Sequence, residues 1–198
     1  MVQQADTTAR RRLLDAAARL FYADGISATG INAITAEAGV ARMSLYNNFA
    51  SKEELVLAYI EVRHREWLEL YLARVRDARD ARDARDDARA GVRAVFDAYI
   101  DHAELGYQYG FRGCGLLNAA AELPVGSPGR EAVRRHKEQV ESILTEHLQM
   151  LTTPERAAGL AEHCCLLLEG GMARAGLEGQ AVRLEQAKRI AAGLVASL

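Results

Sequence analysis

The chain has 198 residues, of which 49% are hydrophobic and 26% are charged, and its formal net charge is −2. A chain of this size can bury a substantial core, and a content of only three prolines favours a mostly helical protein with one small and one larger domain. Its apolar stretches are interrupted by charge, and its first residues lack the apolar core of a signal peptide, so we expect a cytoplasmic protein without a membrane segment. Three cysteines, two of them adjacent, argue against a disulfide framework.

Basic side chains exceed acidic ones in the first quarter of the chain, although the whole chain is slightly acidic. Three consecutive arginines, Arg10 to Arg12, stand at the front of a first helix whose apolar stripe has helical spacing: Leu13, Ala17, Leu20 and Phe21. Such arginines can reach phosphate groups of a nucleic acid. The alternative is a solvated helix start that contacts nothing.

Two short helices and a turn follow between residues 29 and 48. Thr29 is predicted to cap the first of them, in which Ile31 and Ile34 share one face, and Gly39 ends it in a left-handed turn. In the second, Val40 and Leu45 point inward, which leaves a polar set on the outside: Arg42, Met43, Ser44, Tyr46, Asn47 and Asn48.

The outward set of the second short helix suits the major groove of DNA, because Arg, Ser and Asn can hydrogen-bond base edges or phosphates and Met and Tyr can contact thymine methyl groups. Ser51 and Glu54 have capping-box spacing, so a further helix begins at Lys52, whose exposed amides and positive side chain can clamp a phosphate. The predicted DNA-binding residues are Thr29, Arg42, Met43, Ser44, Tyr46, Asn47, Asn48 and Lys52.

The order of these elements resembles the TetR family of transcriptional regulators (TetR/AcrR-like). The elements that carry the resemblance are Gly25, Ala38-Gly39-Val40, Leu45-Tyr46-Asn47-Asn48-Phe49 and Ser51-Lys52-Glu53. The resemblance implies an all-α fold of about nine helices, with a three-helix helix-turn-helix DNA-binding domain in residues 1–50 and a larger helical ligand-sensing and dimerisation domain in residues 51–198.

The helix from Ser51 continues through Trp67 and is long enough to leave the first domain. Residues 76–89 then repeat Arg, Asp and Ala with a period of three, so no apolar face forms and we expect an exposed helical extension or linker with i, i+4 pairs such as Arg76 with Asp80. An apolar helical pattern resumes at Val92, and the glycine-rich stretch from 106 ends in a short helix that Pro124 stops.

Polar side chains in apolar surroundings suggest a pocket for a small, largely apolar effector in the second domain. Its predicted lining is Trp67, Phe96, Tyr99, His102, Phe111, Arg112, Cys114, Asn118 and His163. The aromatics, with Tyr107 and Tyr109, could instead be core, Arg112 could pair with Glu122, and Cys114 could be a small buried hydrophobe or a redox sensor. The histidines and cysteines lack metal-ligand spacing, and no nucleophile elbow or phosphate loop is present, so we expect no metal site, no cofactor and no catalytic centre.

Helices are predicted to open at Ser127-Pro128 and at Thr153-Pro154, and a last helix carries Leu184, Ile190 and Leu194. The last two helices have broad apolar faces, which could pair with a second copy as a four-helix bundle or close the monomer's own core. Together with these faces, the resemblance implies a homodimeric, ligand-responsive repressor that binds a partly palindromic double-stranded DNA operator. The alternatives are an all-α enzyme or a protein-interaction module.

Overall fold

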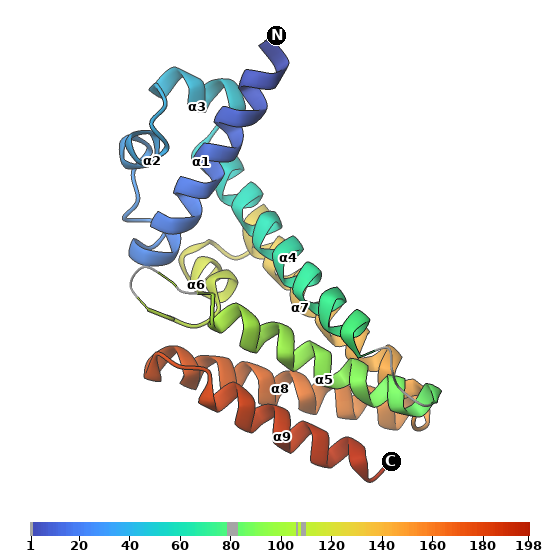
Figure 1. Cartoon of the computed structure of the whole chain (residues 1–198). Helices are drawn as coiled ribbons and strands as arrows, with labels where there is room; N and C mark the ends of the chain where they lie inside the picture. Colours follow the sequence, from blue (N-terminus) through green and yellow to red (C-terminus); the bar gives the residue numbers. More distant parts are fainter. Residues whose placement is uncertain (1, 79–82, 106, 108–109) are drawn as a thin grey trace. The chain divides into compact units, whose positions relative to one another are not determined.

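The computed structural model describes residues 2–78, 83–105, 107 and 110–198, and within these ranges the regular structure is entirely α-helical, as predicted (Figure 1). Nine helices are found there. They are α1 (Val2–Asp24), α2 (Ile31–Ala38), α3 (Arg42–Asn48), α4 (Lys52–Asp77), α5 (Ala84–Ala103), α6 (Gly115–Glu122), α7 (Pro128–Gln149), α8 (Pro154–Glu178) and α9 (Val182–Ala196).

Contacts group the chain into two compact units. Unit 1 comprises Met1–Arg63 and Gly115–Arg134, and unit 2 comprises His64–Cys114 and Arg135–Leu198. Helix α6 and the first turns of α7 come from the middle of the chain. Their contacts nevertheless place them in unit 1, together with the helix-turn-helix. The division into domains 1–50 and 51–198 that the resemblance implies stays a prediction.

Unit 1 is built around the apolar stripe of α1. Leu13 and Ala17 are fully buried there, and the ring of Phe21 meets that of Tyr59 from α4 edge to face at 5.5 Å between centroids. Helices α2, α3 and α6 all contact α1. Each contributes apolar side chains to the core, among them Ile34 and Leu45, which are both fully buried. A single apolar core therefore fixes both short helices.

Most predicted helix starts are confirmed, and one cap is wrong. The Ser51 hydroxyl accepts the amide of Glu54, whose carboxylate in turn accepts the amide of Ala50, so α4 begins at Lys52 as predicted. Thr29 does not cap α2, because Gly30 occupies the cap position without a side-chain hydrogen bond. The Thr29 hydroxyl instead donates to the carbonyl oxygen of Gly25 at 2.6 Å, which closes the turn that precedes α2.

Unit 2 is a helical bundle in which α9 packs along both α5 and α8 (Figure 1). Asp83 caps α5 by accepting the amides of Arg85 and Asp86. The Arg74 guanidinium of α4 forms a two-pronged ion pair with Asp101 of α5. The pair predicted between Arg76 and Asp80, the other pairs of the Arg-Asp-Ala repeat that involve residues 79–82, and Tyr109 lie outside the described residues.

None of the described helices combines the length and the apolarity that crossing a membrane demands.

Candidate functional site

The outward set of α3 forms one exposed surface on unit 1. Arg42, Met43, Tyr46 and Asn47 are exposed, whereas Leu45 of the same helix is fully buried. The Arg42 guanidinium lies 5.8 Å from the centroid of the Tyr46 ring. Ser44 and Asn48 are half-buried, and the Asn48 amide donates to the Ser44 carbonyl oxygen at 2.8 Å. A seven-residue helix with one buried anchor and this exposed polar face is able to enter a major groove.

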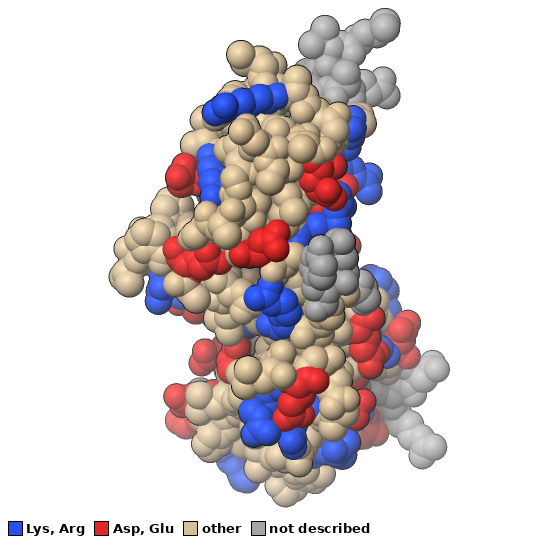
Figure 2. All heavy atoms as spheres, turned by 90° about the vertical axis from the view of Figure 1, so that its left-hand side faces the viewer, with Lys and Arg blue, Asp and Glu red and all other residues tan. Residues whose placement is uncertain are grey.

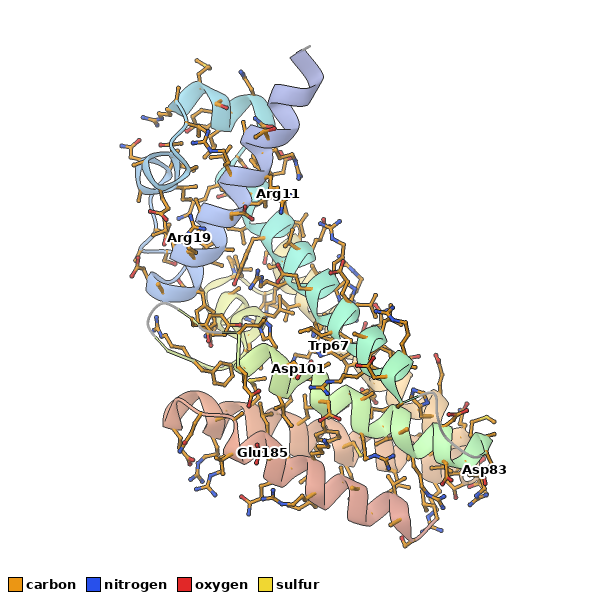
Figure 3. The ribbon with its side chains drawn as sticks, in the orientation of Figure 1. Arg11, Arg19, Trp67, Asp83, Asp101 and Glu185 are labelled. Atoms are coloured by element: carbon orange, nitrogen blue, oxygen red, sulfur yellow. The ribbon has the colours of Figure 1, made fainter. Side chains whose placement is uncertain are left out.

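The arginines of α1 hold the helix-turn-helix in place. Arg12 donates to the carbonyl oxygen of Gly39 at 2.9 Å, and Gly39 has the left-handed φ of 60° that ends α2. The Arg10 guanidinium lies 4.7 Å from the centroid of the Phe49 ring. Arg19 pairs with Glu37 of α2, and Figure 3 shows Arg11 and Arg19 on the same helix. Arg12 thus supports the turn after α2, and Arg10 supports the end of α3. Phosphate contact by Arg10 to Arg12 stays a prediction.

Of the predicted phosphate ligands, Thr29 belongs to the segment between α1 and α2, and Lys52 contacts that segment from α4. Thr29 is 3% exposed, and the Lys52 ammonium donates to the carbonyl oxygen of Ile26 at 2.6 Å. An ammonium has three donors, so this bond leaves Lys52 able to bind a phosphate as well. Basic and acidic groups alternate on the face drawn in Figure 2. The DNA contacts of Thr29 and Lys52 stay predictions.

Aromatic side chains gather inside unit 2 around Trp67 of α4, which is 3% exposed (Figure 3). The indole stacks on the ring of Tyr71 at 5.7 Å and lies 5.4 Å from the ring of Tyr99, measured between centroids. The His136 ring of α7 stands perpendicular to the indole at 5.3 Å. Of the residues predicted for a pocket, the structure brings Trp67, Tyr99 and Cys114 into this cluster.

A half-buried lysine and a half-buried glutamate adjoin the aromatic cluster. The Lys137 ammonium of α7 donates to Glu169 of α8 at 2.7 Å and to the Tyr99 hydroxyl at 3.4 Å, and it lies 3.8 Å from the Cys114 sulfur. The Tyr99 hydroxyl is 3.1 Å from Nε2 of His136, whose Nδ1 is 2.9 Å from Nδ1 of His64. We call this set, with Trp67 and Tyr71, the polar-aromatic cluster.

The direction of the first hydrogen bond in this series follows from the lysine. An ammonium can only donate, so the Tyr99 hydroxyl accepts from Lys137, and its own hydrogen is available for a hydrogen bond to Nε2 of His136. When the Tyr99 hydroxyl donates, neutral His136 carries its hydrogen on Nδ1 and donates to Nδ1 of His64. The opposite pair of neutral tautomers reverses both histidine hydrogen bonds.

The acid-base properties of the cluster agree with these roles. Burial, with Lys137 and His64 nearby, lowers the pKa of His136 to about 2. Burial also raises the pKa of the Tyr99 hydroxyl. Burial by itself would lower the pKa of Lys137, but the facing Tyr99, Cys114 and Glu169 raise it above its usual value. The cluster therefore presents a charged ammonium beside neutral rings.

Two polar atoms in the cluster are buried without a hydrogen bond to any described residue. They are Nε1 of Trp67 and Oε2 of Glu169. A buried donor or acceptor without a partner costs about 1–3 kcal/mol. The indole N–H can therefore bind an acceptor atom, and the carboxylate oxygen can bind a donor, on a molecule that enters the cluster.

The other predicted pocket residues are dispersed. His102, Tyr107 and Phe111 form a second ring cluster, with the Tyr107 hydroxyl 2.9 Å from Nε2 of His102. Phe96 is buried in the unit 2 core. Arg112, Asn118 and His163 are exposed, and Asn118 belongs to unit 1. Glu122 binds the backbone amides of Ile26 and Ser27 in unit 1, and its pairing with Arg112 stays a prediction.

Sequence analysis missed Lys137 and Glu169 as site residues. Lys137 stands three or four positions from Val133 and Val140, which are buried on α7, so a lysine interrupts an apolar helical face. That interruption was the available signal for a half-buried charge. Glu169 had no comparable signal, because it becomes a partner only when α8 packs beside α7.

Metal and thiol chemistry find little support in the described residues. No group of three or more His, Cys, Asp or Glu side chains there is arranged to hold a metal ion. Burial raises the pKa of Cys164 to about 11 and that of Cys165 to about 12. Thiols in such surroundings are unreactive.

An open apolar groove of about 560 Å³ runs along α8 and α9. Its floor is apolar and includes Leu166, Ile190 and Leu194, which are 65%, 48% and 38% exposed. Gly171 faces inward, where a Cβ atom would lie 3.1 Å from that of Ala187, whereas a Cβ at Gly170 would meet nothing within 4 Å. The two helices therefore close the core of the monomer with one face and leave a second apolar face uncovered.

The exposed helix α3, packed on α1 and preceded by the turn at Gly39, defines a helix-turn-helix DNA-binding regulator. Residues 13–59 match the model of the bacterial regulatory proteins of the tetR family. The chain is 34% identical to a solved TetR-family transcriptional regulator from Streptomyces coelicolor, with 96% of each chain covered and a TM-score of 0.80. The chain belongs to the tetR family, whose members are regulators and not enzymes.

Two curated relatives match over part of their length. One is the HTH-type transcriptional activator FasR from Mycolicibacterium smegmatis, 41% identical over 100 residues, which are 50% of this chain and 43% of the relative. The other is the HTH-type transcriptional repressor KstR2 from Mycobacterium tuberculosis, 41% identical over 68 residues, which are 34% of this chain and 32% of the relative. The matched region spans less than half of either relative, so their individual activities do not transfer.

Proposed function

We propose that this protein is a cytoplasmic, homodimeric transcriptional repressor that binds a partly palindromic operator through α3 and is released by a small, largely apolar effector. The exposed face of α3 above the buried Leu45 is the observation that carries the operator-binding part. A dimer places two such helices on paired half-sites, which adds affinity and fixes their register. The names of the two curated relatives include an activator and a repressor, so the sign of regulation needs its own test.

Within the DNA interface, we assign base-edge contacts to Arg42, Ser44 and Asn47, mixed base and phosphate contacts to Tyr46 and Asn48, apolar contact to Met43, and phosphate contacts to Lys52 and Thr29. Lys52→Ala is expected to weaken binding to all sequences about equally and to reduce the salt slope. Asn47→Ala is expected to relax the preference at one base pair. A Lys52 variant with altered sequence preference and an intact salt slope would contradict its assignment.

The dimer would form along the α8–α9 groove. Its exposed leucine and isoleucine side chains form an uncovered apolar surface, and Gly170 leaves room for the close approach of a second helix. A second copy of the same groove would cover both surfaces and complete a four-helix bundle.

The polar-aromatic cluster is the proposed effector site. The indole N–H of Trp67 lacks a hydrogen-bond partner among the described residues, and it lies among aromatic rings that suit a largely apolar molecule carrying one acceptor atom. Trp67 is the only tryptophan of the chain, so its fluorescence reports on this site alone. Titration with candidate effectors should change that emission in parallel with release from DNA, whereas release without any emission change would place the effector elsewhere.

Release requires that the effector prefers the DNA-incompetent state. Moving a population from almost all competent to almost all incompetent takes about 5.5 kcal/mol of differential binding, so tight binding alone is not sufficient. By resemblance, the helix after Ser51 would carry the shift that separates the two recognition helices.

The deciding experiment is selection of bound sequences from a random duplex pool at two salt concentrations. A two-fold symmetric motif with steep salt dependence is expected. A reporter placed behind that motif then distinguishes repression from activation. Weak, sequence-independent binding would refute the proposal that the protein binds an operator, and it would favour a protein-interaction module instead.

A further inference from the structure

A carboxylate from α6 is bonded to the turn that leads into the helix-turn-helix. Glu122 accepts the backbone amide of Ile26 at 2.9 Å and that of Ser27 at 2.7 Å. These residues are more than ninety positions apart in sequence, and both segments belong to unit 1. Neither base contact nor effector binding accounts for this arrangement.

The peptide group between Ile26 and Ser27 is held at both ends of its dipole. Its carbonyl oxygen accepts from the Lys52 ammonium at 2.6 Å, and its N–H donates to the Glu122 carboxylate at 2.7 Å. Hydrogen bonds to ionised groups are roughly twice as strong as those between neutral groups. One peptide unit of this turn is thus fixed by two opposite charges from α4 and α6.

Local geometry shows that the turn is built for this carboxylate. Gly25 has a φ of 91°, which favours glycine, and a Cβ atom there would lie 2.7 Å from Oε1 of Glu122. The Thr29 hydroxyl donates to the Gly25 carbonyl oxygen and closes the other side of the turn. Backbone hydrogen bonds, with the Ser27 amide the largest contributor, lower the pKa of Glu122, which keeps it ionised at neutral pH.

We propose that Glu122 is a positioning residue for operator binding, which holds the 26–27 peptide together with Lys52 and thereby fixes the entry into α2 and α3. Ile26 is buried in the unit 1 core and the turn leads directly into α2, so movement of this peptide would displace the short helices. Without the carboxylate, the turn samples other arrangements, and DNA must select the competent one. The inference rests on the proposed operator binding.

The test compares Glu122→Gln and Glu122→Ala with the wild-type chain at full length. Two quantities are measured: hydrogen exchange of the Ile26 and Ser27 amides, and affinity for the selected operator. Exchange should accelerate in both variants. Operator affinity should fall by about tenfold if the competent turn is populated about one tenth of the time. Glu141→Gln, which makes the same charge change at an exposed position of α7 in unit 2, is the matched control and should alter neither quantity.

Each alternative outcome is informative. Faster exchange with unchanged operator affinity would overturn the proposal, because the carboxylate would then stabilise the turn without positioning the DNA-binding helices. Unchanged exchange would show that Glu122 does not hold the turn. If Glu122→Ala fails to fold, the isosteric Glu122→Gln decides. A wild-type chain that selects no operator refutes the proposed function, and protected amides in that chain would still establish the bond to the turn.

Discussion

Gly91 gives a quantitative test of packing in unit 2. It lies inside α5, and a Cβ atom built there would approach the ring of His147 from α7 to between 2.1 and 2.3 Å. That ring accepts or donates a hydrogen bond of 2.8 Å at the Tyr71 hydroxyl, so it cannot move without disturbing a second side chain. Gly91→Ala therefore forces either the ring or the helix to shift.

The magnitude follows from opposing contributions. Replacing glycine by alanine inside a helix stabilises it by about 0.5–1 kcal/mol. Overpacking a core costs about 1–3 kcal/mol, and a lost hydrogen bond costs about 0.5–1.5 kcal/mol. The expected net loss is about 2 kcal/mol, which lowers the Tm of a chain of this size by about 4–8 °C.

Thermal unfolding at equal protein concentration measures this loss, and Gly159→Ala in α8 is the control. A Cβ atom at Gly159 meets nothing within 4 Å, so that variant should be stabilised by about 0.5–1 kcal/mol. Adding His147→Ala to Gly91→Ala should remove the clash, so the two substitutions together should cost less than the sum of their separate effects. A Gly91→Ala chain that melts at or above the wild-type Tm would refute the reasoning.

Three further predictions concern the polar-aromatic cluster and the groove. Lys137→Met should destabilise the chain by about 2 kcal/mol in urea unfolding, because it leaves the half-buried Glu169 carboxylate without its ammonium. Adding Glu169→Gln should recover part of this loss of stability. A double variant that is no more stable than Lys137→Met would contradict the pairing. The folded-state pKa of His136 lies below the unfolded value of 6.5, so neutral His136 contributes fully to the free energy of unfolding above pH 6.5. This contribution should fall by about 1.4 kcal/mol between pH 7.5 and 5.5. His136→Asn should therefore make the stability of the chain depend less on pH over this range. Leu166→Glu should convert the proposed dimer into monomers in sedimentation, while Leu72→Glu, an exposed α4 control, should not. A Leu166→Glu chain that still sediments as a dimer would exclude the groove as the interface.

The sequence by itself determined the helix-turn-helix. Its signals are local: the spacing of Ile31, Ile34 and Leu45, the left-handed turn at Gly39, and the start of α4 at Ser51 act within a few residues of one another. Periodicity and caps therefore predicted a mostly helical chain and the starts of α4, α7 and α8, whereas α5 begins at Ala84, before the apolar pattern expected from Val92. The one wrong cap, Thr29, arose because a hydroxyl near a helix start can bond a preceding carbonyl oxygen as readily as a following amide.

Only the tertiary structure decided which distant side chains meet. The bond from Glu122 to the amides of Ile26 and Ser27 and the bond from Lys137 to Glu169 join segments whose separation in sequence leaves no periodic signal. The predicted pocket residues likewise divided into a buried cluster and exposed positions such as Arg112, because the burial of a side chain depends on which helices pack beside it. Local chemistry fixes the elements of this protein, and the packing of those elements fixes its polar contacts.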